Sequence, residues 1–198
     1  MVRAILLAAG ESRRMGRPKA ALTVAPGGAT FVAAIADTIE RTSVRDLVVV
    51  AGAHPLAVRE ALAGRAVPVI DNPRWRDGQL SSLLAGLAAV DGSEVEAVLV
   101  ALVDCPLVRA ATVDALLEAW RRTRAPIVRP THAGRHGHPV IFDRAVFEDL
   151  RAAPPDRGAK AVLQQHAGTV VDLPVDDAGV LADIDTPADY DALTRRVE

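Results

Sequence analysis

Short apolar runs rich in β-branched residues alternate along the chain with segments of helical periodicity, and this alternation constrains the fold more than any other feature. Residues 47–50 and 98–101 are apolar at every position, as expected for strands that helices cover on both faces. Strands are expected at 3–8, 46–51, 67–70, 97–103, 126–128, 139–142 and 169–173, and helices at 31–41, 56–62, 80–90 and 112–122. The pattern predicts a three-layer α/β/α, Rossmann-like fold around a mostly parallel sheet.

The length of 198 residues fits one domain with its own hydrophobic core. Neither a repeat nor a linker interrupts the chain, although the alternation becomes less regular after Arg124. We therefore expect a single domain over residues 1–198, with a first half of about 1–124 and a second half of about 125–198.

Charge and cysteine content exclude several classes of protein. A formal net charge of −2 provides no general attraction for nucleic acid or an anionic membrane. The longest apolar run, residues 97–103, is far shorter than the roughly 20 residues of a membrane-spanning helix. Cys105 is the single cysteine, which excludes an internal disulfide and suits a reducing compartment. We expect a cytoplasmic protein that binds neither nucleic acid nor membrane.

The segment that follows the first expected strand has the composition of a phosphate-binding loop. Ala8, Ala9 and Gly10 are small enough to let the backbone approach a triphosphate, while Arg14 and Lys19 supply positive charge. The segment is neither a G-x-G-x-x-G nor a Walker sequence. The alternative is an ordinary solvated turn between strand and helix, but the concentration of basic and small residues favours phosphate binding.

Acidic residues occur beyond the carboxyl ends of the expected strands, which is where proteins with an open parallel sheet bind their ligands. Asp104 directly follows the most apolar strand, and a hard cation such as Mg²⁺ takes one or two carboxylates together with substrate phosphates. The alternative for Asp104 is a turn or helix cap before Pro106. Asp183 and Asp185 alternate, so both can point to one side of an extended segment, while Asp185 or Thr186 can cap the last helix.

Three further groups of side chains are candidates for binding or catalysis. Ser81 or Ser82 can cap the helix expected at 80–90 and present a hydroxyl to a base or ribose. His136 and His138 resemble a metal-ligand pair but lack a third ligand at suitable spacing, which favours a pocket wall or a solvated loop. Cys105 has no nearby histidine to activate it, so we exclude it from the catalytic set.

Five segments together resemble one family. Residues 7–19 match L-A-A-G-x-S-x-R-M-G-x-x-K, residues 72–86 match N-x-x-W-x-x-G-x-x-x-S-L-x-x-G, and residues 137–142 match G-x-P-x-x-F. Residues 183–190 match D-I-D-T-P-x-D-Y, and residues 103–106 match G-D-x-P except that Val103 replaces the glycine. This order of motifs is similar to the molybdenum cofactor cytidylyltransferases, within the MobA-like NTP transferase superfamily.

The resemblance implies a role for each matched position. The first half would bind the nucleotide and the second half the acceptor, along the segment before Phe142. Mg²⁺ would be held by Asp104 and Asp185, with Asp183 as the alternative second ligand. The implied catalytic residues are Arg14, Lys19 and Asp104, and the implied nucleotide-binding residues are Ala8, Ala9, Gly10, Arg14, Lys19, Gly78, Ser82 and Asp104.

The implied reaction is transfer of CMP from CTP to the terminal phosphate of molybdopterin or molybdenum cofactor, with release of pyrophosphate and delivery of the product to a molybdoenzyme. Such an in-line transfer needs positioning and charge neutralisation rather than a protein nucleophile. Ala9 favours a pyrimidine, because the related guanylyltransferases begin L-A-G-G. Alternatives are a guanylyltransferase, a cytidylyltransferase for methylerythritol phosphate or a sugar phosphate, and a non-catalytic nucleotide-binding regulator. A dinucleotide-dependent oxidoreductase is disfavoured because the first turn lacks the expected glycine pattern.

Overall fold

The structure is a computed structural model that describes residues 1–44 and 46–197. Within these residues the strands form one eight-stranded sheet in the order β3-β2-β1-β4-β7-β5-β6, with β8 paired to β5. The strands are β1 Val2–Ala8, β2 Leu47–Ala51, β3 Val69–Asp71, β4 Ala97–Leu102, β5 Ile127–His132, β6 Arg135–His136, β7 Val140–Asp143 and β8 Val171–Pro174.

The connectivity of the sheet brings several strand ends to one edge. β1 pairs in parallel with both β2 and β4, while β7 lies antiparallel between β4 and β5. Because β7 runs against its neighbours, the residues before Val140 lie at the same edge as the carboxyl ends of β1 and β4. Loops from both halves of the sequence therefore meet there.

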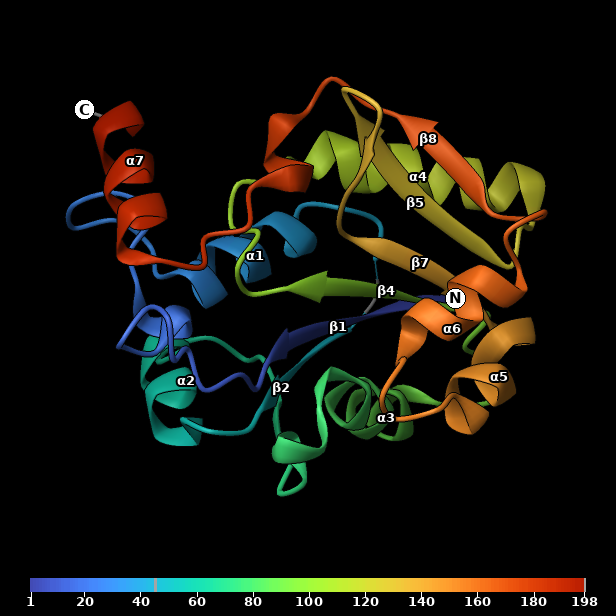
Figure 1. The fold of residues 1–198 in the computed structure, drawn as a ribbon, viewed down its shortest axis with the longest axis horizontal. Helices are drawn as coiled ribbons and strands as arrows, with labels where there is room; N and C mark the ends of the chain where they lie inside the picture. The colour runs from blue at the N-terminus through green and yellow to red at the C-terminus, as the bar shows by residue number, and fades with distance from the viewer. Residues whose placement is uncertain (45, 198) are drawn as a thin grey trace.

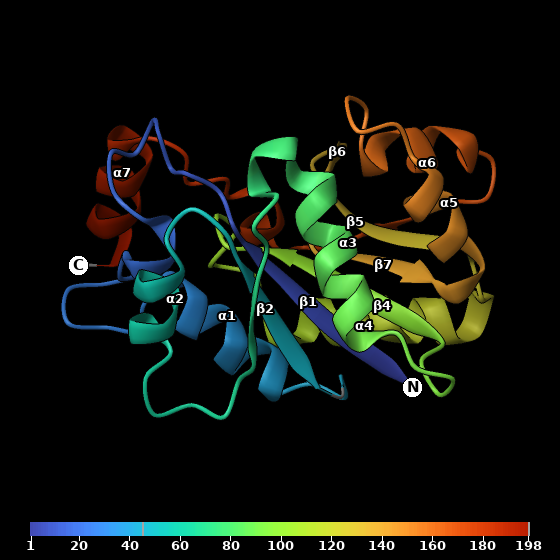
Figure 2. The same cartoon turned by 90° about the horizontal axis from the view of Figure 1, so that it is seen from below.

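Helices cover both faces of the sheet (Figures 1 and 2). The α-helices are α1 Phe31–Glu40, α2 Pro55–Ala61, α3 Gln79–Val90, α4 Ala110–Thr123, α5 Phe147–Ala152, α6 Ala159–Gln165 and α7 Pro187–Val197. Short 3-10 helices occupy Lys19–Ala21, Trp75–Asp77, Arg144–Val146 and Ala178–Leu181. One apolar cluster joins the sheet to α1 and α4, and a second joins it to α3, α5 and α6. The expected three-layer α/β/α fold with a mostly parallel sheet is confirmed.

The central strand shows how the sequence builds the two cores. Ala4 and Leu6 of β1 pack into the cluster with α1 and α4, whereas Ile5 and Leu7 pack into the cluster with α3. Alternate side chains of a strand point to opposite faces, so a strand that is apolar at every position supplies both cores. This is the physical reason why the uninterrupted apolar runs indicated central strands.

The expected elements agree with the observed ones to within a few residues, except in the second half of the chain. There β5 extends to His132, four residues beyond the expected strand, and β6 and α5 were not anticipated. Two residues of β6 and six of α5 are too few for a periodic pattern to be recognised. No helix in the described ranges, 1–44 and 46–197, is long and apolar enough to cross a membrane.

Candidate functional site

A cleft of about 380 Å³ opens at the carboxyl ends of β1 and β4. It contains most of the residues singled out from the sequence. They are Ala8, Ala9, Gly10, Arg14, Lys19, Ser82, Asp104 and Asp185. Gly78 lies instead in a neighbouring cleft. The structure therefore brings segments separated by more than a hundred residues into one cavity.

The loop after β1 is held in shape by Ser12, which adopts a positive φ of 56°. The backbone carbonyl of Ser12 accepts hydrogen bonds from the amides of Met15 and Gly16 at 3.0 and 2.9 Å. Its hydroxyl accepts a further hydrogen bond from the amide of Lys19 at 3.1 Å. The Met15 side chain is buried in the core with α1, so the loop folds back and brings Lys19 into the cleft.

Lys19 makes ion pairs with two acidic residues from other segments. Its side chain is only 9% exposed, and its Nζ lies 3.2 Å from Oδ2 of Asp104 and also contacts Oδ1 of Asp185. Burial by itself lowers the pKa of Lys19, but the hydrogen bond to Asp185 and the charge of Asp104 raise the pKa above its ordinary value. Lys19 is therefore a charged ammonium held between two carboxylates.

Arg14 approaches the same acidic pair from the solvent side. Its Nη2 lies 2.5 Å from Oδ2 of Asp185, and its side chain is 71% exposed. The two oxygens of Asp185 thus contact different cations, the buried Lys19 and the exposed Arg14. An exposed guanidinium retains the freedom to turn toward an incoming anion, whereas the ammonium of Lys19 is fixed by its burial.

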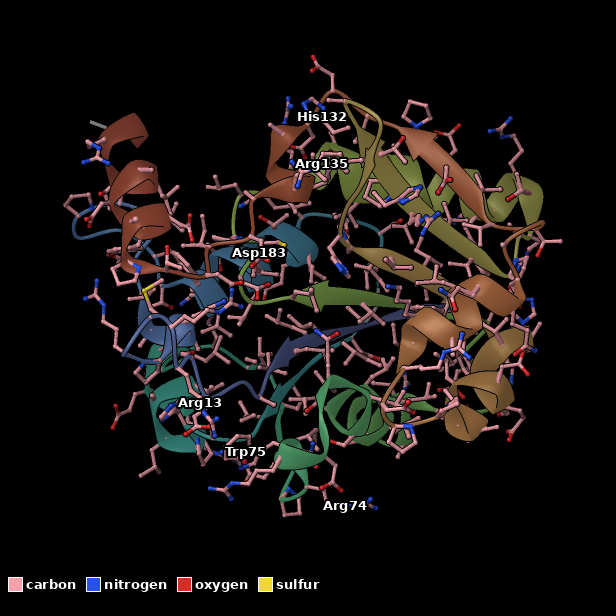
Figure 3. All side chains as sticks on the ribbon, in the orientation of Figure 1. Arg13, Arg74, Trp75, His132, Arg135 and Asp183 are labelled. Carbon is pink, nitrogen blue, oxygen red and sulfur yellow. The ribbon has the colours of Figure 1, made fainter. Side chains whose placement is uncertain are left out.

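Three carboxylates converge at the same point, from Asp104, Asp183 and Asp185. One oxygen from each residue lies within 4.8 Å of the others, and Asp183 is labelled in Figure 3 beside the end of β4. The carbonyl of Asp104 accepts a hydrogen bond from the amide of Ile184 at 2.9 Å, which joins the two segments. Partial burial, followed by the charges of Asp104 and Asp185, raises the pKa of Asp183. Such a group of hard oxygen donors fits a divalent cation.

A buried carboxylate attaches the segment before these acids to the core. Oδ2 of Asp177 accepts hydrogen bonds from the hydroxyl of Thr112 at 2.6 Å and the amide of Arg109 at 3.0 Å, and Oδ1 accepts from the amide of Gly179. Burial alone raises the pKa of Asp177, but these hydrogen bonds lower it below its ordinary value. No local sequence pattern indicates this anchor, because Thr112 and Arg109 lie more than sixty residues away in the chain.

The segment after the acids is fixed by a helix cap. The Oγ1 of Thr186 accepts a hydrogen bond from the amide of Asp189 at 3.3 Å, and Oδ2 of Asp189 accepts from the amide of Thr186 at 2.8 Å. This is a reciprocal capping box at the start of α7. Of the two caps considered from the sequence, Thr186 takes the role, which leaves the carboxylate of Asp185 free to point into the cleft.

The expectation that Ser81 or Ser82 caps α3 is wrong. The N-terminal cap of α3 is Gly78, whose φ is 99°, and no side chain caps it. The side-chain Nδ2 of Asn72 instead donates hydrogen bonds to both serine hydroxyls, at 2.9 and 3.0 Å. The two hydroxyls therefore connect the loop before α3 to the helix, while Ser82 also lines the first cleft.

A second cleft of about 440 Å³ adjoins the first and shares Leu7, Gln79 and Leu102 with it. Its sheet side is formed by strand residues from both halves of the chain, and its outer side by the loop before α6. These lining residues are Val100, Val140, Phe142, His138, Pro155, Asp156, Arg157, Gly158, Ala159, Lys160 and Leu163, together with Gly78, Leu80 and Leu83 of α3 and its cap.

The two histidines considered as metal ligands lie in different environments. His136 contacts Asp172 at 3.2 Å on the exposed surface, whereas His138 lines the second cleft. Among the described residues, the group that could hold a metal ion consists of Asp104, Asp183 and Asp185. Burial, followed by the charges of Asp104 and Asp183, raises the pKa of Cys105, which agrees with leaving this thiol out of the catalytic set.

Two polar residues of the first cleft, His54 and Gln79, were not identified from the sequence. His54 follows β2, and its Nε2 lies 3.1 Å from the carbonyl oxygen of Glu11 in the loop after β1. Gln79 lies at the first position of α3 and lines both clefts. The available signal was positional, because His54 and Gln79 both come shortly after a strand or turn at the carboxyl edge of the sheet.

Comparison with known proteins identifies relatives of the whole chain. Residues 4–170 match the family model described as the MobA-like NTP transferase domain. The nicotine blue oxidoreductase of Paenarthrobacter nicotinovorans is 32% identical, with 93% of this chain and 92% of the relative covered. A probable molybdenum cofactor guanylyltransferase of Mycobacterium ulcerans is 30% identical (96% and 92% covered), and the molybdenum cofactor cytidylyltransferase of Escherichia coli is 26% identical (94% and 92% covered).

Solved structures show the same fold. A homologue of Rv0371c from Mycobacterium sp. strain JC1 is 30% identical, with a TM-score of 0.84 over 100% of this chain and 98% of the other. The Rv0371c protein of Mycobacterium tuberculosis in complex with manganese is 28% identical, with a TM-score of 0.74 and 98% of both chains covered. The expected nucleotidyltransferase type of the α/β fold is thereby confirmed.

Proposed function

Because the chain belongs to the MobA-like NTP transferase family, we propose that it transfers CMP from CTP to the terminal phosphate of molybdopterin, with release of pyrophosphate. The observation that carries this proposal is the meeting of Lys19, Asp104 and Asp185 in one cleft beside a loop of small residues. Side chains that can neutralise a triphosphate and carboxylates that can hold a metal ion thus contact one another in the same cleft.

The triphosphate would lie along the loop from Ala8 to Lys19. Ala8, Ala9 and Gly10 line the cleft, and a Cβ atom placed on Gly10 would meet nothing within 4 Å, so the backbone is open to a ligand there. Arg14 and Lys19 would neutralise the charge that develops on the departing pyrophosphate. Both cations now contact Asp185, and their release toward the phosphates would free that carboxylate.

Movement of Arg14 and Lys19 toward the phosphates would leave acidic side chains that can bind a divalent cation. Asp104 and Asp185 would hold it, with Asp183 close enough to contribute, and the manganese complex of the related Rv0371c protein supports a metal of this type. We propose Mg²⁺, which prefers oxygen ligands and substrate phosphates. When bound, it supplies positive charge to the phosphates during transfer.

The acceptor would enter through the second cleft. Leu7, Gln79 and Leu102 form the border between the clefts, so the α-phosphorus and the acceptor phosphate would meet near that border. The sheet side of the second cleft is mainly apolar, which suits the ring system of molybdopterin better than a polyol phosphate. The product would then pass to a molybdoenzyme.

The base that the first cleft accepts is tested by calorimetric titration of CTP, GTP, ATP and UTP, each with and without Mg²⁺. Selective, metal-dependent binding of CTP, with pyrophosphate release on addition of molybdopterin, is the expected result. Tighter binding of GTP would overturn the use of Ala9 as an indicator of a pyrimidine. Nucleotide binding without pyrophosphate release from any acceptor tested would favour a non-catalytic nucleotide-binding regulator.

An oxidoreductase is the second candidate function, and the similarity to the nicotine blue oxidoreductase over 93% of this chain is the observation that favours it. The loop after β1 still lacks the glycine pattern of a dinucleotide site. Oxidation of NADH or NADPH by the purified protein with nicotine blue as acceptor, in the absence of any nucleoside triphosphate, would support this candidate against the transferase.

A further inference from the structure

Tyr190, in the first turn of α7, contacts the chain on both sides of Lys19. Cζ of Arg17 lies 4.9 Å from the centre of the Tyr190 ring, and the Tyr190 hydroxyl lies 3.3 Å from Oγ1 of Thr23. The ring of Phe31, at the start of α1, lies 6.0 Å from the Tyr190 ring in a tilted arrangement. In Figures 1 and 2, α7 accordingly lies beside the segment that follows β1.

The same helical turn is attached to Asp185. The amide of Tyr190 donates a hydrogen bond to the carbonyl of Thr186 at 3.1 Å. Oδ2 of the adjacent Asp189 accepts hydrogen bonds from the amides of Asp185 and Thr186, at 3.2 and 2.8 Å. The backbone of Asp185 and the ring of Tyr190 are therefore fixed to one turn of helix, so a shift of this turn would move the carboxylate of Asp185 in the cleft.

Two sets of contacts thus join the loop after β1 to the acidic segment. In the cleft, Arg14 and Lys19 contact Asp185. Elsewhere, Arg17 lies over Tyr190, and these two described residues are not part of the lining of the first cleft. In the proposed reaction Arg14 and Lys19 turn toward the phosphates and leave Asp185. The contact between Arg17 and Tyr190 involves no group that the phosphates or the metal ion need, so it can persist through this exchange.

The contact between Arg17 and Tyr190 contributes little to packing. Arg17 is exposed, and α7 is already attached to the core by Leu193, which is buried in the cluster with α1. The attraction between a guanidinium and an aromatic ring extends to about 6 Å from the ring centre, so the loop can shift slightly without losing it. These properties suit a contact that guides the loop rather than one that stabilises the fold.

We propose that Arg17 and Tyr190 are positioning residues that keep the phosphate-binding loop and the carboxylate of Asp185 at a fixed spacing while the nucleotide and the metal ion are bound. This inference rests on the proposed nucleotidyl transfer. Asp185 and the phosphates on the loop can share one metal ion only if the two segments keep that spacing. The contact therefore controls how much a divalent cation increases the affinity for CTP.

The test is calorimetric titration of CTP into wild type, Tyr190→Leu and Tyr190→Phe, each with Mg²⁺ and with a chelator. A cation–π contact at an exposed site changes an equilibrium about two- to fivefold. In Tyr190→Leu we therefore expect the increase in CTP affinity caused by Mg²⁺ to be about two- to fivefold smaller than in wild type, with CTP affinity in the chelator unchanged. Tyr190→Phe keeps the ring and should retain most of the increase.

Arg17→Met removes the cation at an exposed position and provides the measurement if Tyr190→Leu does not fold. It should show the same smaller effect of Mg²⁺. The double variant should lose no more than either single variant, because both changes remove one contact. The matched control is Arg124→Met, which removes a guanidinium 4.6 Å from the ring of Trp120 and should leave the effect of Mg²⁺ unchanged.

A wild-type effect of Mg²⁺ in both Tyr190→Leu and Arg17→Met would overturn the role of this contact while leaving nucleotide binding intact. An equal fall in CTP affinity with Mg²⁺ and with the chelator would also overturn it, since a purely structural role has that result. If the wild-type protein bound no nucleoside triphosphate, the proposed function would fail, and this inference with it.

Discussion

Nζ of Lys19 lies 3.2 Å from Oδ2 of Asp104, although 85 positions separate the two residues in the chain. Lys19 also contacts Asp185, so one buried ammonium neutralises two carboxylates in the cleft. A bound metal ion and a bound triphosphate would compete for these partners, the metal ion for the acids and the triphosphate for Lys19. Each ligand would thereby release the group that the other needs, so the two are expected to bind more tightly together than alone.

Replacement of Lys19 by Met should have opposite effects on binding of the triphosphate and on binding of the metal ion. Loss of the ammonium removes a charged hydrogen-bond donor worth about 1.5–3 kcal/mol, so CTP affinity in the presence of Mg²⁺ should fall about 10- to 150-fold. Mn²⁺ alone should bind more tightly, because Asp104 and Asp185 lose their cation. Calorimetry for CTP and electron paramagnetic resonance for free Mn²⁺ measure the two changes. Arg59→Met, at an exposed ion pair with Asp71, is the control.

Unchanged Mn²⁺ affinity in Lys19→Met would contradict competition between the ammonium and the metal ion for the carboxylates. Unchanged CTP affinity would contradict the assignment of Lys19 to the triphosphate.

Replacement of Asp104 by Asn removes one negative charge with almost no change in size. Turnover should fall by about 10²-fold or more, as for loss of a group that stabilises transition-state charge, and Mn²⁺ affinity should fall as well. The measurements are pyrophosphate release and metal titration. The control Asp71→Asn, at the surface ion pair with Arg59, should retain wild-type turnover and wild-type Mn²⁺ affinity. Wild-type turnover in Asp104→Asn would contradict the assignment of Asp104 as a ligand of the metal ion.

Asp177 should make stability depend on pH in the acidic range. Burial raises the pKa of Asp177, but hydrogen bonds from Thr112 and two backbone amides lower it. The resulting pKa lies below the ordinary value of 3.8. The stabilisation is therefore present above pH 3.8, the unfolded-state value, and is lost as pH falls through the lower folded-state pKa. Asp177→Asn should unfold at a lower temperature near neutral pH and lose less stability between about pH 5 and pH 2.

Thermal unfolding of wild type and Asp177→Asn across that pH range checks this prediction. The two curves should converge as the pH falls. A constant difference in unfolding temperature at every pH would show that Asp177 contributes packing or hydrogen bonds but no proton-linked stability.

Gly86 should be intolerant of a side chain because α3 approaches the sheet closely there. A Cβ atom at Gly86 would lie 2.4 Å from Cγ2 of Ile5 and 3.0 Å from Cγ2 of Val50. Overpacking of this kind costs about 1–3 kcal/mol, so Gly86→Ala should lower the unfolding temperature by roughly 2–12 °C. Gly168→Ala, where a Cβ atom would meet nothing within 4 Å, is the control. Differential scanning calorimetry should show the loss in the first variant alone.

The layered fold was predictable from sequence because local composition and burial agree. Strands such as β2 and β4 are apolar at almost every position, and this property follows from their coverage by helices on both faces. The loop after β1 was recognisable for a similar reason, since Ala8 to Lys19 are contiguous and their chemistry can be judged together. Expectations were poorer after Arg124, where β6 and α5 are too short to show a period.

The tertiary structure alone decided which distant residues meet. The sequence by itself determined the chemistry of the candidates, a cationic loop and three acids, since those properties belong to the residues whatever the fold. It did not determine that Lys19 would contact both Asp104 and Asp185, that Asp177 would anchor the acidic segment, or that reversal of β7 would bring His138 to the clefts. These relationships depend on strand order and direction, because contacts across a sheet are set by which strands pair and not by distance along the chain.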